Sequence, residues 1–288
     1  MYDDILLPYD DSEGATEVLH HAGELAHWAD ATITALYVAD TTRDSVTLVE
    51  GQTVDVLERQ GEDVVAEAAA TLESLGVPHD TDVVQGNPAP TIVDYAERYD
   101  HDLVVMPTRG REGVSRYVLG SVAEKVVRLS SVPVLSVRMQ EDEALSFPYE
   151  GLLVPTDGSD AATHAAEHVV EFAAALDATV HALSVVDDGG LDPDVRATAA
   201  GEESERAARE ALESVESMAD SRGVDTVTHV EHGDPADVIL EHVDADGVDA
   251  VGMGTTGRRG TDRILLGSVA ETTVRSAPVP VLTVADPE

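Results

Sequence analysis

The chain has 288 residues, of which 43% are hydrophobic and only 3% aromatic, so its core must consist mainly of Val, Leu, Ile and Ala. It carries 57 acidic and 17 basic residues, a formal charge of −40, and no cysteine. Because a surface this acidic repels phosphate backbones and anionic lipids, we expect neither nucleic acid nor membrane as a partner. The lack of cysteine excludes disulfides, thiolate metal sites and cysteine catalysis.

The same composition predicts where the protein works. No apolar run approaches the roughly 20 residues of a membrane span, and the first residues lack the basic region of a secretory signal. We therefore expect a cytoplasmic protein. Because molar salt screens most of the self-repulsion of such a chain, the charge predicts a halophilic cytoplasm and indicates no function by itself.

The sequence repeats itself at a constant spacing of 147 residues. Segments 7–12, 35–40, 86–88, 119–124 and 132–135 return as 154–159, 182–187, 233–235, 266–271 and 279–282. A constant offset means that the copies align without net insertion, so the pattern predicts two similar domains. We place these domains at residues 1–138 and 150–285, joined by a linker at 139–149 that includes the acidic stretch 140–143.

Each copy alternates short apolar runs with longer amphipathic stretches, which is typical of parallel strands joined by helices. Ser12 and Ser159 directly follow a strand and are predicted N-caps. In the first copy we predict strands near 3–9, 31–38, 80–85, 102–107 and 133–138, and helices near 12–29, 51–75, 89–98 and 118–130.

The candidate site lies at strand ends, because open α/β sheets bind ligands beyond the carboxyl ends of their strands. After the fourth strand of the second copy, Gly254 and Gly257 are followed by nine residues and then by Gly267 and Ser268 at a helix start. Glycines let backbone N–H groups approach a phosphate, and a helix N-terminus adds partial positive charge. Asp157 follows the first strand, where it can contact either a ligand or the next helix as a neighbour of its N-cap.

Basic residues gather in the same two regions. Windows 109–128 and 258–275 hold nine of the 17 and are net positive. Clustered cations around a glycine-rich loop indicate an anionic ligand, although pairing with acidic neighbours is the structural alternative. The nine are Arg109, Arg111, Arg116, Lys125, Arg128, Arg258, Arg259, Arg263 and Arg275.

Two other motifs do not favour an enzyme. Residues 252–257 match G-x-G-x-x-G, but a dinucleotide fingerprint follows the first strand and this one follows the fourth. Residues 164–168 match the zinc-protease pattern H-x-x-E-H. The periodicity, however, places His164, His168 and Glu171 on a polar stripe that we interpret as a solvated helix face, so no metal is expected.

These residues identify the chain as similar to tandem universal stress proteins, over nearly all of both copies. ATP-binding members carry G-x2-G-x9-G-[ST], and the second copy matches every fixed position. The resemblance implies ATP, with Mg²⁺ as a companion, at a site in the second copy. That site comprises Pro155, Asp157, Val185, Met253, Gly254, Gly257, Arg258, Gly267, Ser268 and Val269.

The first copy departs from the pattern at its first glycine, where Pro107 stands. Proline fixes φ near −65° and removes an N–H, so the loop cannot begin in the same way. We therefore predict a weaker second site there. It comprises Pro8, Asp10, Val38, Gly110, Arg111, Gly120, Ser121 and Val122.

The resemblance further implies, for each copy, a Rossmann-like fold of the adenine nucleotide alpha hydrolase-like type. Its sheet has five parallel strands in the order 3-2-1-4-5 with helices on both faces. The last strands of the copies would pair as an intramolecular pseudo-dimer, and a homodimer is a further assembly. The expected function is ATP-dependent regulation in a stress response through an unidentified protein partner. Without a P-loop lysine we expect at most slow hydrolysis. A nucleotide-independent interaction protein is the alternative.

Overall fold

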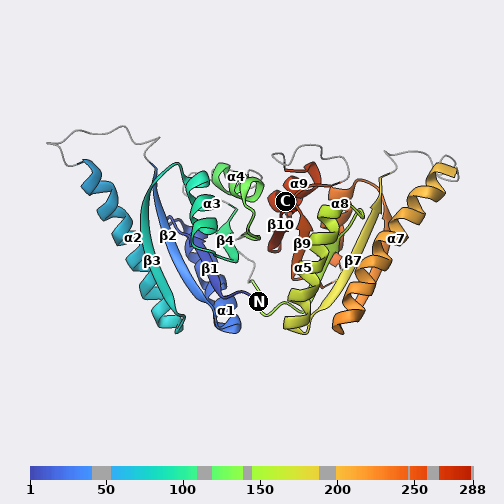
Figure 1. Cartoon of the computed structure of the whole chain (residues 1–288), viewed down its shortest axis with the longest axis horizontal. Coiled ribbons are helices and arrows are strands. Elements are labelled where there is room, and N and C mark those ends of the chain that lie inside the picture. Colours follow the sequence, from blue (N-terminus) through green and yellow to red (C-terminus); the bar gives the residue numbers. More distant parts are fainter. Residues whose placement is uncertain are drawn as a thin grey trace. The chain divides into compact units, whose positions relative to one another are not determined.

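The computed structural model describes residues 1–40, 53–108, 119–138, 145–187, 199–245, 247–257 and 266–286. Its chain forms two compact units, Met1–Phe147 and Pro148–Glu288. Figure 1 labels most of their elements and colours the chain along the sequence. The acidic stretch 140–143, predicted to be part of the linker, lies outside the described residues.

Unit 1 is an open sheet with the strand order β3-β2-β1-β4-β5. All four neighbouring pairs are parallel, which confirms the predicted order. Its elements are β1 (Asp4–Pro8), α1 (Glu13–Ala29), β2 (Thr32–Asp40), α2 (Thr53–Leu75), β3 (His79–Gly86), α3 (Pro88–Arg98), β4 (Leu103–Pro107), α4 (Ser121–Leu129) and β5 (Val134–Val137).

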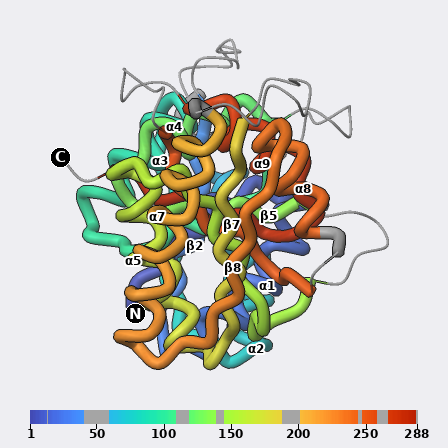
Figure 2. Tube along the Cα trace, turned by 90° about the vertical axis from the view of Figure 1, so that its right-hand side faces the viewer, coloured from blue at the N-terminus to red at the C-terminus, as the bar shows by residue number. Residues whose placement is uncertain are grey.

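Unit 2 repeats this arrangement, with the strand order β8-β7-β6-β9-β10 and four parallel pairs. Figure 2 follows its chain past β7 and β8, with the long helix α7 beside them. The elements are β6 (Gly151–Pro155), α5 (Asp160–Leu176), β7 (Thr179–Val186), α7 (Ala199–Arg222), β8 (Thr226–His232), α8 (Pro235–Ala245), β9 (Ala250–Gly254), α9 (Ser268–Ser276) and β10 (Val281–Val284).

Helices cover both faces of each sheet. In unit 2, α5 packs on α7, and α8 packs on α9; unit 1 shows the same pairing of α1 with α2 and of α3 with α4. Strands covered on both faces are expected to be continuously apolar. Accordingly, every residue of β4, β5, β9 and β10 is buried. None of the helices among the described residues is long and apolar enough to cross a membrane.

The turns after the first strands place the helices that border the site. Ser12 accepts a hydrogen bond from the amide of Ala15, and Ser159 accepts one from the amide of Ala162, both at 3.2 Å. Both predicted N-caps are therefore confirmed. Each of these helices starts directly beyond the carboxyl end of its strand, so its first turn borders the edge of the sheet where the site is predicted.

Candidate functional site

The predicted site of unit 2 lies where the strand order reverses. β6 pairs with β7 on one side and with β9 on the other, and the chain leaves β6 and β9 toward opposite faces of the sheet. A crevice beyond the carboxyl ends is expected at such a switch point. The turn after β6 and the loop after β9 therefore meet at one edge.

Backbone hydrogen bonds tie the start of α9 to the residue after β9 and that residue to β10. The amide of Gly267 donates to the carbonyl of Thr255 at 2.9 Å, and the amide of Thr255 donates to the carbonyl of Val284 at 3.2 Å. Gly267 is the N-cap of α9 and makes no side-chain cap within the described chain. The first turn of α9 thus begins beside the end of β9, and the amides of a first turn have no partner within their own helix, which is the arrangement that favours an anion.

Asp157 and Gly257 face each other across this edge. A Cβ atom on Gly257 would lie 2.9 Å from Oδ2 of Asp157, so a larger residue would displace the carboxylate. Oδ1 of Asp157 accepts the amide of Ser159 at 3.0 Å. The exposed carboxylate of Asp157 thus has two neighbours: Oδ1 stabilises the turn after β6, and Oδ2 borders Gly257.

Gly254 has a different surrounding, which the sequence did not reveal. A Cβ atom there would lie 2.9 Å from the backbone carbonyl oxygen of Ala161 in α5. A Cβ atom on Gly252 would overlap the side chain of Val169 in the same helix. Both glycines therefore let α5 pack closely on β9, and this packing accounts for the first half of the G-x-G-x-x-G match.

The other predicted residues of unit 2 are spread around this edge. Pro155, Val185 and Val269 are partly exposed, Ser268 is exposed and Met253 is buried within β9. The amide of Thr156 donates to the carbonyl of Leu183 at 2.8 Å, which holds the ends of β6 and β7 together. Arg258 lies outside the described residues.

Unit 1 has the same closing hydrogen bonds. The amide of Gly120 donates to the carbonyl of Thr108 at 2.8 Å, and the amide of Thr108 donates to the carbonyl of Val137 at 2.9 Å. Oδ1 of Asp10 accepts the amide of Ser12 at 3.1 Å. Pro8, Val38 and Val122 are partly exposed and Ser121 is exposed. Gly110 and Arg111 lie outside the described residues.

Pro107 is accompanied by a second difference between the copies. It ends β4 at the position that Gly254 holds in β9, and Gly14 of α1 holds the position of Ala161 in α5. The glycine of this pair of positions is therefore in the strand in unit 2 and in the helix in unit 1.

Three of the nine clustered basic residues lie within the described part of the chain: Lys125, Arg128 and Arg275. Nη1 of Arg275 donates to Oε1 of Glu271 at 3.2 Å, one turn away in α9. For this arginine the structural alternative, pairing with an acidic neighbour, therefore holds. The loop arginines of the prediction lie outside the described residues.

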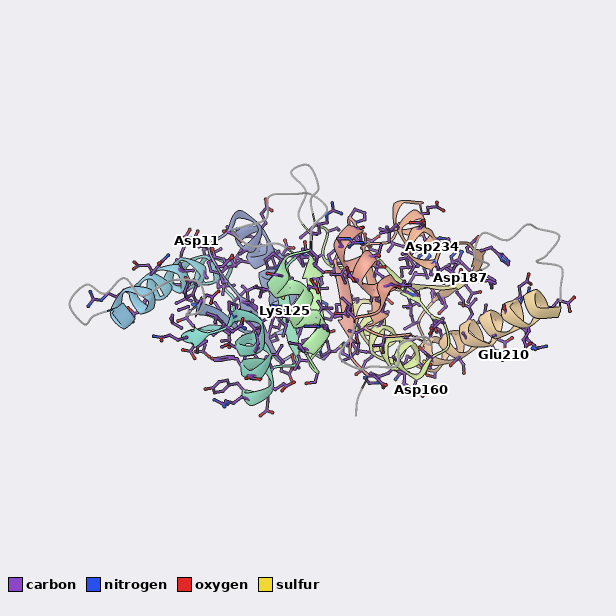
Figure 3. The ribbon with its side chains drawn as sticks, turned by 90° about the horizontal axis from the view of Figure 1, so that it is seen from above. Asp11, Lys125, Asp160, Asp187, Glu210 and Asp234 are labelled. Atoms are coloured by element: carbon purple, nitrogen blue, oxygen red, sulfur yellow. The ribbon has the colours of Figure 1, made fainter. Side chains whose placement is uncertain are left out.

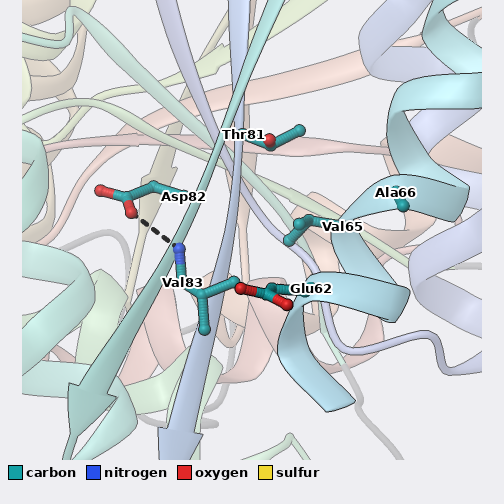
Figure 4. A pocket seen from close by; sticks show the side chains of 6 residues that line it. All are labelled: Glu62, Val65, Ala66, Thr81, Asp82 and Val83. Atoms are coloured by element: carbon teal, nitrogen blue, oxygen red, sulfur yellow. Dashed lines mark hydrogen bonds between the residues drawn. The ribbon is translucent and has the colours of Figure 1, made fainter. Parts of the chain in front are cut away.

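A cavity of about 370 Å³ lies elsewhere, between α2 and the edge strand β3 of unit 1 (Figure 4). Glu62, Val65 and Thr81 are among its lining residues. Its wall includes Asp82, whose Oδ1 accepts the amide of Val83 at 2.8 Å. None of the predicted site residues within the described ranges lines this cavity.

Comparisons with known proteins agree with this architecture. The profile of the Universal stress protein family matches residues 1–138 and again residues 148–285. A universal stress protein of Methanocaldococcus jannaschii is 40% identical over 146 residues, covering 49% of this chain and 84% of that protein. One from Mycolicibacterium smegmatis is 29% identical over 291 residues, covering 97% of this chain and 96% of that protein.

A solved structure extends the likeness to three dimensions. The crystal structure of a universal stress protein from Archaeoglobus fulgidus has a TM-score of 0.75 and 26% identity to this chain. The match covers 99% of this chain and 98% of that one. Because the family profile matches both halves and members of the family match the whole length, the chain belongs to the universal stress protein family, with two of its domains in tandem.

Proposed function

We propose that this protein binds ATP in unit 2 and that nucleotide occupancy regulates its conformation or its choice of protein partner. One observation carries the proposal: the first turn of α9 is held beside the end of β9, next to the facing pair Asp157 and Gly257. Backbone amides and the positive end of a helix suit the phosphates of a nucleotide.

Each part of the edge has a chemical role in this proposal. The amides of α9 and the hydroxyl of Ser268 donate to phosphate oxygens, and Gly257 leaves room for the chain of phosphates. The carboxylate of Asp157 accepts a hydrogen bond from a ribose hydroxyl, and the partly exposed Val185 borders the adenine. Bound Mg²⁺ would neutralise phosphate charge, which matters in a chain with a formal charge of −40.

We propose regulation rather than turnover as the main activity. The sequence has no G-K-[ST] P-loop. Slow hydrolysis would need only bound triphosphate, Mg²⁺ and a positioned water, so we expect at most a low rate. The acidic composition further supports a salt-rich cytoplasm as the setting in which this regulation takes place.

A nucleotide-independent role is a second candidate, and it applies best to unit 1. Pro107 replaces the first glycine of the motif, and its ring fills the strand end where unit 2 has only a hydrogen at Cα. Unit 1 is therefore proposed to bind nucleotide weakly or to serve as an interaction domain.

Isothermal titration of the full chain with Mg-ATP in 2 M KCl tests the proposal. Gly257→Val is expected to abolish binding in unit 2, because its side chain meets both the phosphates and Asp157. Asp157→Ala is expected to weaken binding by about 1–2 kcal/mol through the lost hydrogen bond. The matched pair Ser268→Ala and Ser121→Ala should separate the units, since only the first is expected to reduce affinity.

The stoichiometry decides between the candidates. One ATP per chain, lost in Gly257→Val, supports the proposed asymmetry. Two per chain would show that unit 1 tolerates Pro107. No binding by the wild type, or full binding by Gly257→Val with native circular dichroism, would contradict the nucleotide site and leave the interaction role.

A further inference from the structure

The two units differ in one side chain at the end of their first strands. Tyr9 follows β1, and Thr156 stands at the equivalent position after β6, 147 residues later. The backbones match there, because each amide donates to the second strand: Tyr9 to Leu36 at 2.9 Å and Thr156 to Leu183 at 2.8 Å. The same backbone therefore carries a phenol ring in one unit and a small hydroxyl side chain in the other.

In unit 1 the side chain of Tyr9 is buried against α1, within electrostatic reach of α2. The side chain is 3% exposed, and its hydroxyl lies 3.2 Å from Oγ1 of Thr16 in α1. The pKa of Tyr9 is raised mainly by burial, and Glu67 of α2 raises it further through charge repulsion. The ring thus extends from the strand end toward both helices.

In unit 2 the equivalent space is open. A cavity of about 190 Å³ lies between α5, α7 and the turn after β6. Its wall includes Thr156, Thr163 and Ser214, which are the counterparts of Tyr9, Thr16 and Glu67 at the constant offset. Replacing the tyrosine by threonine therefore leaves a ring-sized space that keeps the hydroxyl partner.

The size and lining of the cavity define what it can hold. An apolar protein cavity of about 150 Å³ is large enough for benzene. Here Ala211, Val215 and Met218 supply apolar contacts, whereas Thr163 and Ser214 supply hydroxyl groups. Ser214 is exposed and stands where unit 1 has the carboxylate of Glu67, while the exposed Glu210 of α7 also lines the cavity.

We propose that this cavity is a binding site for an aromatic ring that carries a hydroxyl or similar polar substituent. The ring occupies the position of the Tyr9 phenol, and its polar group bonds to Thr163. Gly158 and Thr156 line the cavity on either side of Asp157 in the chain, so the site adjoins the proposed nucleotide site. It does not depend on nucleotide binding.

The free tyrosine side chain, p-cresol, is the probe. The chain has five methionines, and with ¹³C-methyl labelling Met218 reports on the cavity while Met253 reports on β9. Titration of the full chain in 2 M KCl is expected to move the Met218 signal saturably, because an aromatic ring shifts nearby methyl resonances. No saturable change at Met218 up to the solubility of p-cresol would overturn the proposal.

The two units supply matched variants. Thr156→Tyr installs the residue of unit 1 and is expected to weaken p-cresol binding at least tenfold, whereas Tyr9→Ala should create a second site in unit 1. Ser214→Glu restores the carboxylate of unit 1 and gives an independent loss if Thr156→Tyr does not fold, as judged by circular dichroism. Unchanged p-cresol binding in a folded Thr156→Tyr or Ser214→Glu protein would overturn the assignment.

The ring could belong to a separate small molecule or to the adenine base of a nucleotide. Competition separates these sources. If ATP moves Met218 and displaces p-cresol, the base occupies the cavity. If both bind together and Thr156→Tyr leaves ATP affinity unchanged, a separate aromatic molecule is the ligand. Loss of ATP binding in Gly257→Val with p-cresol binding retained keeps this site distinct from the proposed function.

Discussion

His21 and His168 occupy the same position in α1 and α5, at the constant offset. His21 is 2% exposed, its ring lies edge-to-face with Phe147 at 6.0 Å, and burial lowers its pKa to about 4. Burial also lowers the pKa of His168. The predicted polar stripe of α5 is therefore solvated only in part: Glu171 is exposed, whereas His164 and His168 are partly exposed.

The buried histidine predicts a component of acid sensitivity. Since the pKa of His21 falls from 6.5 in the unfolded chain to about 4 in the fold, the unfolded state binds the proton first as the pH drops. Its contribution is present above pH 6.5 and is lost progressively toward pH 4, by about 2 kcal/mol at pH 5. Urea unfolding of wild type and His21→Leu at pH 7 and pH 5 should show the variant losing less stability.

A buried neighbour without a titrating group provides the control. Leu19→Ala should lower the free energy of unfolding by about the same amount at both pH values, because it removes only packing. Parallel pH curves for His21→Leu and wild type would show that His21 is not responsible.

Single residues also mark what the sequence could not predict at the site. The motif located Gly257 and Gly267, and the structure places them at the end of β9 beside Asp157 and Thr255. It could not show that Gly254 lies against helix backbone and so differs from the loop glycines. Nor could it show that the buried Tyr9 stands where unit 2 has a cavity. Both depend on contacts between segments far apart in the chain.

At the scale of elements, the packing of α5 on β9 explains the glycines of that strand. Gly254 lies against the backbone of α5, which cannot give way as a flexible side chain can. By contrast, a Cβ atom on Gly267 would be 3.4 Å from the carbonyl oxygen of Thr255, an ordinary contact. Of these two glycines of one motif, Gly254 is therefore required for helix packing, whereas Gly267 has room for a side chain.

This difference predicts opposite outcomes for two alanine substitutions. Gly254→Ala should lower the free energy of unfolding by about 1–3 kcal/mol, because α5 must move away from β9. Gly267→Ala, at an N-cap with negative φ, should cost less than about 1 kcal/mol. Thermal and urea unfolding of the two variants measure this directly, and equal destabilisation would contradict the packing argument.

The elements themselves were largely predictable. Predicted strands near 31–38 and 102–107 correspond to Thr32–Asp40 and Leu103–Pro107, and the helix near 12–29 corresponds to Glu13–Ala29. Such agreement is expected where both faces of a strand are covered and apolar runs are continuous. Because the sequence is duplicated, each element could be predicted from two copies. The pairing of the last strands of the two units remains a prediction.

For the whole molecule, charge is the dominant feature. The formal charge is −40, and the only lysine is Lys125. Figure 3 labels Lys125 with five acidic residues of both units, and all six are exposed. The five are Asp11, Asp160, Asp187, Glu210 and Asp234. Repulsion among like charges at the surface favours expanded states, so the folded chain depends on screening.

Screening predicts a specific dependence of stability on salt. Between 0.1 and 1 M KCl the Debye length falls from about 10 Å to about 3 Å, so most of the repulsion between surface carboxylates is removed within that range. We expect the free energy of unfolding in urea to rise by at least about 2 kcal/mol over it, a large share of the about 5–15 kcal/mol typical of a domain. Urea is uncharged and leaves the ionic strength unchanged.

Sucrose distinguishes screening from general exclusion of cosolvent from the surface. It should stabilise the chain without reproducing the steep rise below 1 M salt, because it does not screen charge. A replacement of exposed carboxylates, such as Asp160→Asn with Asp187→Asn and Asp234→Asn, should reduce the salt-dependent gain. If salt and sucrose acted alike, or if the triple variant kept the full gain, carboxylate repulsion would not be what salt relieves.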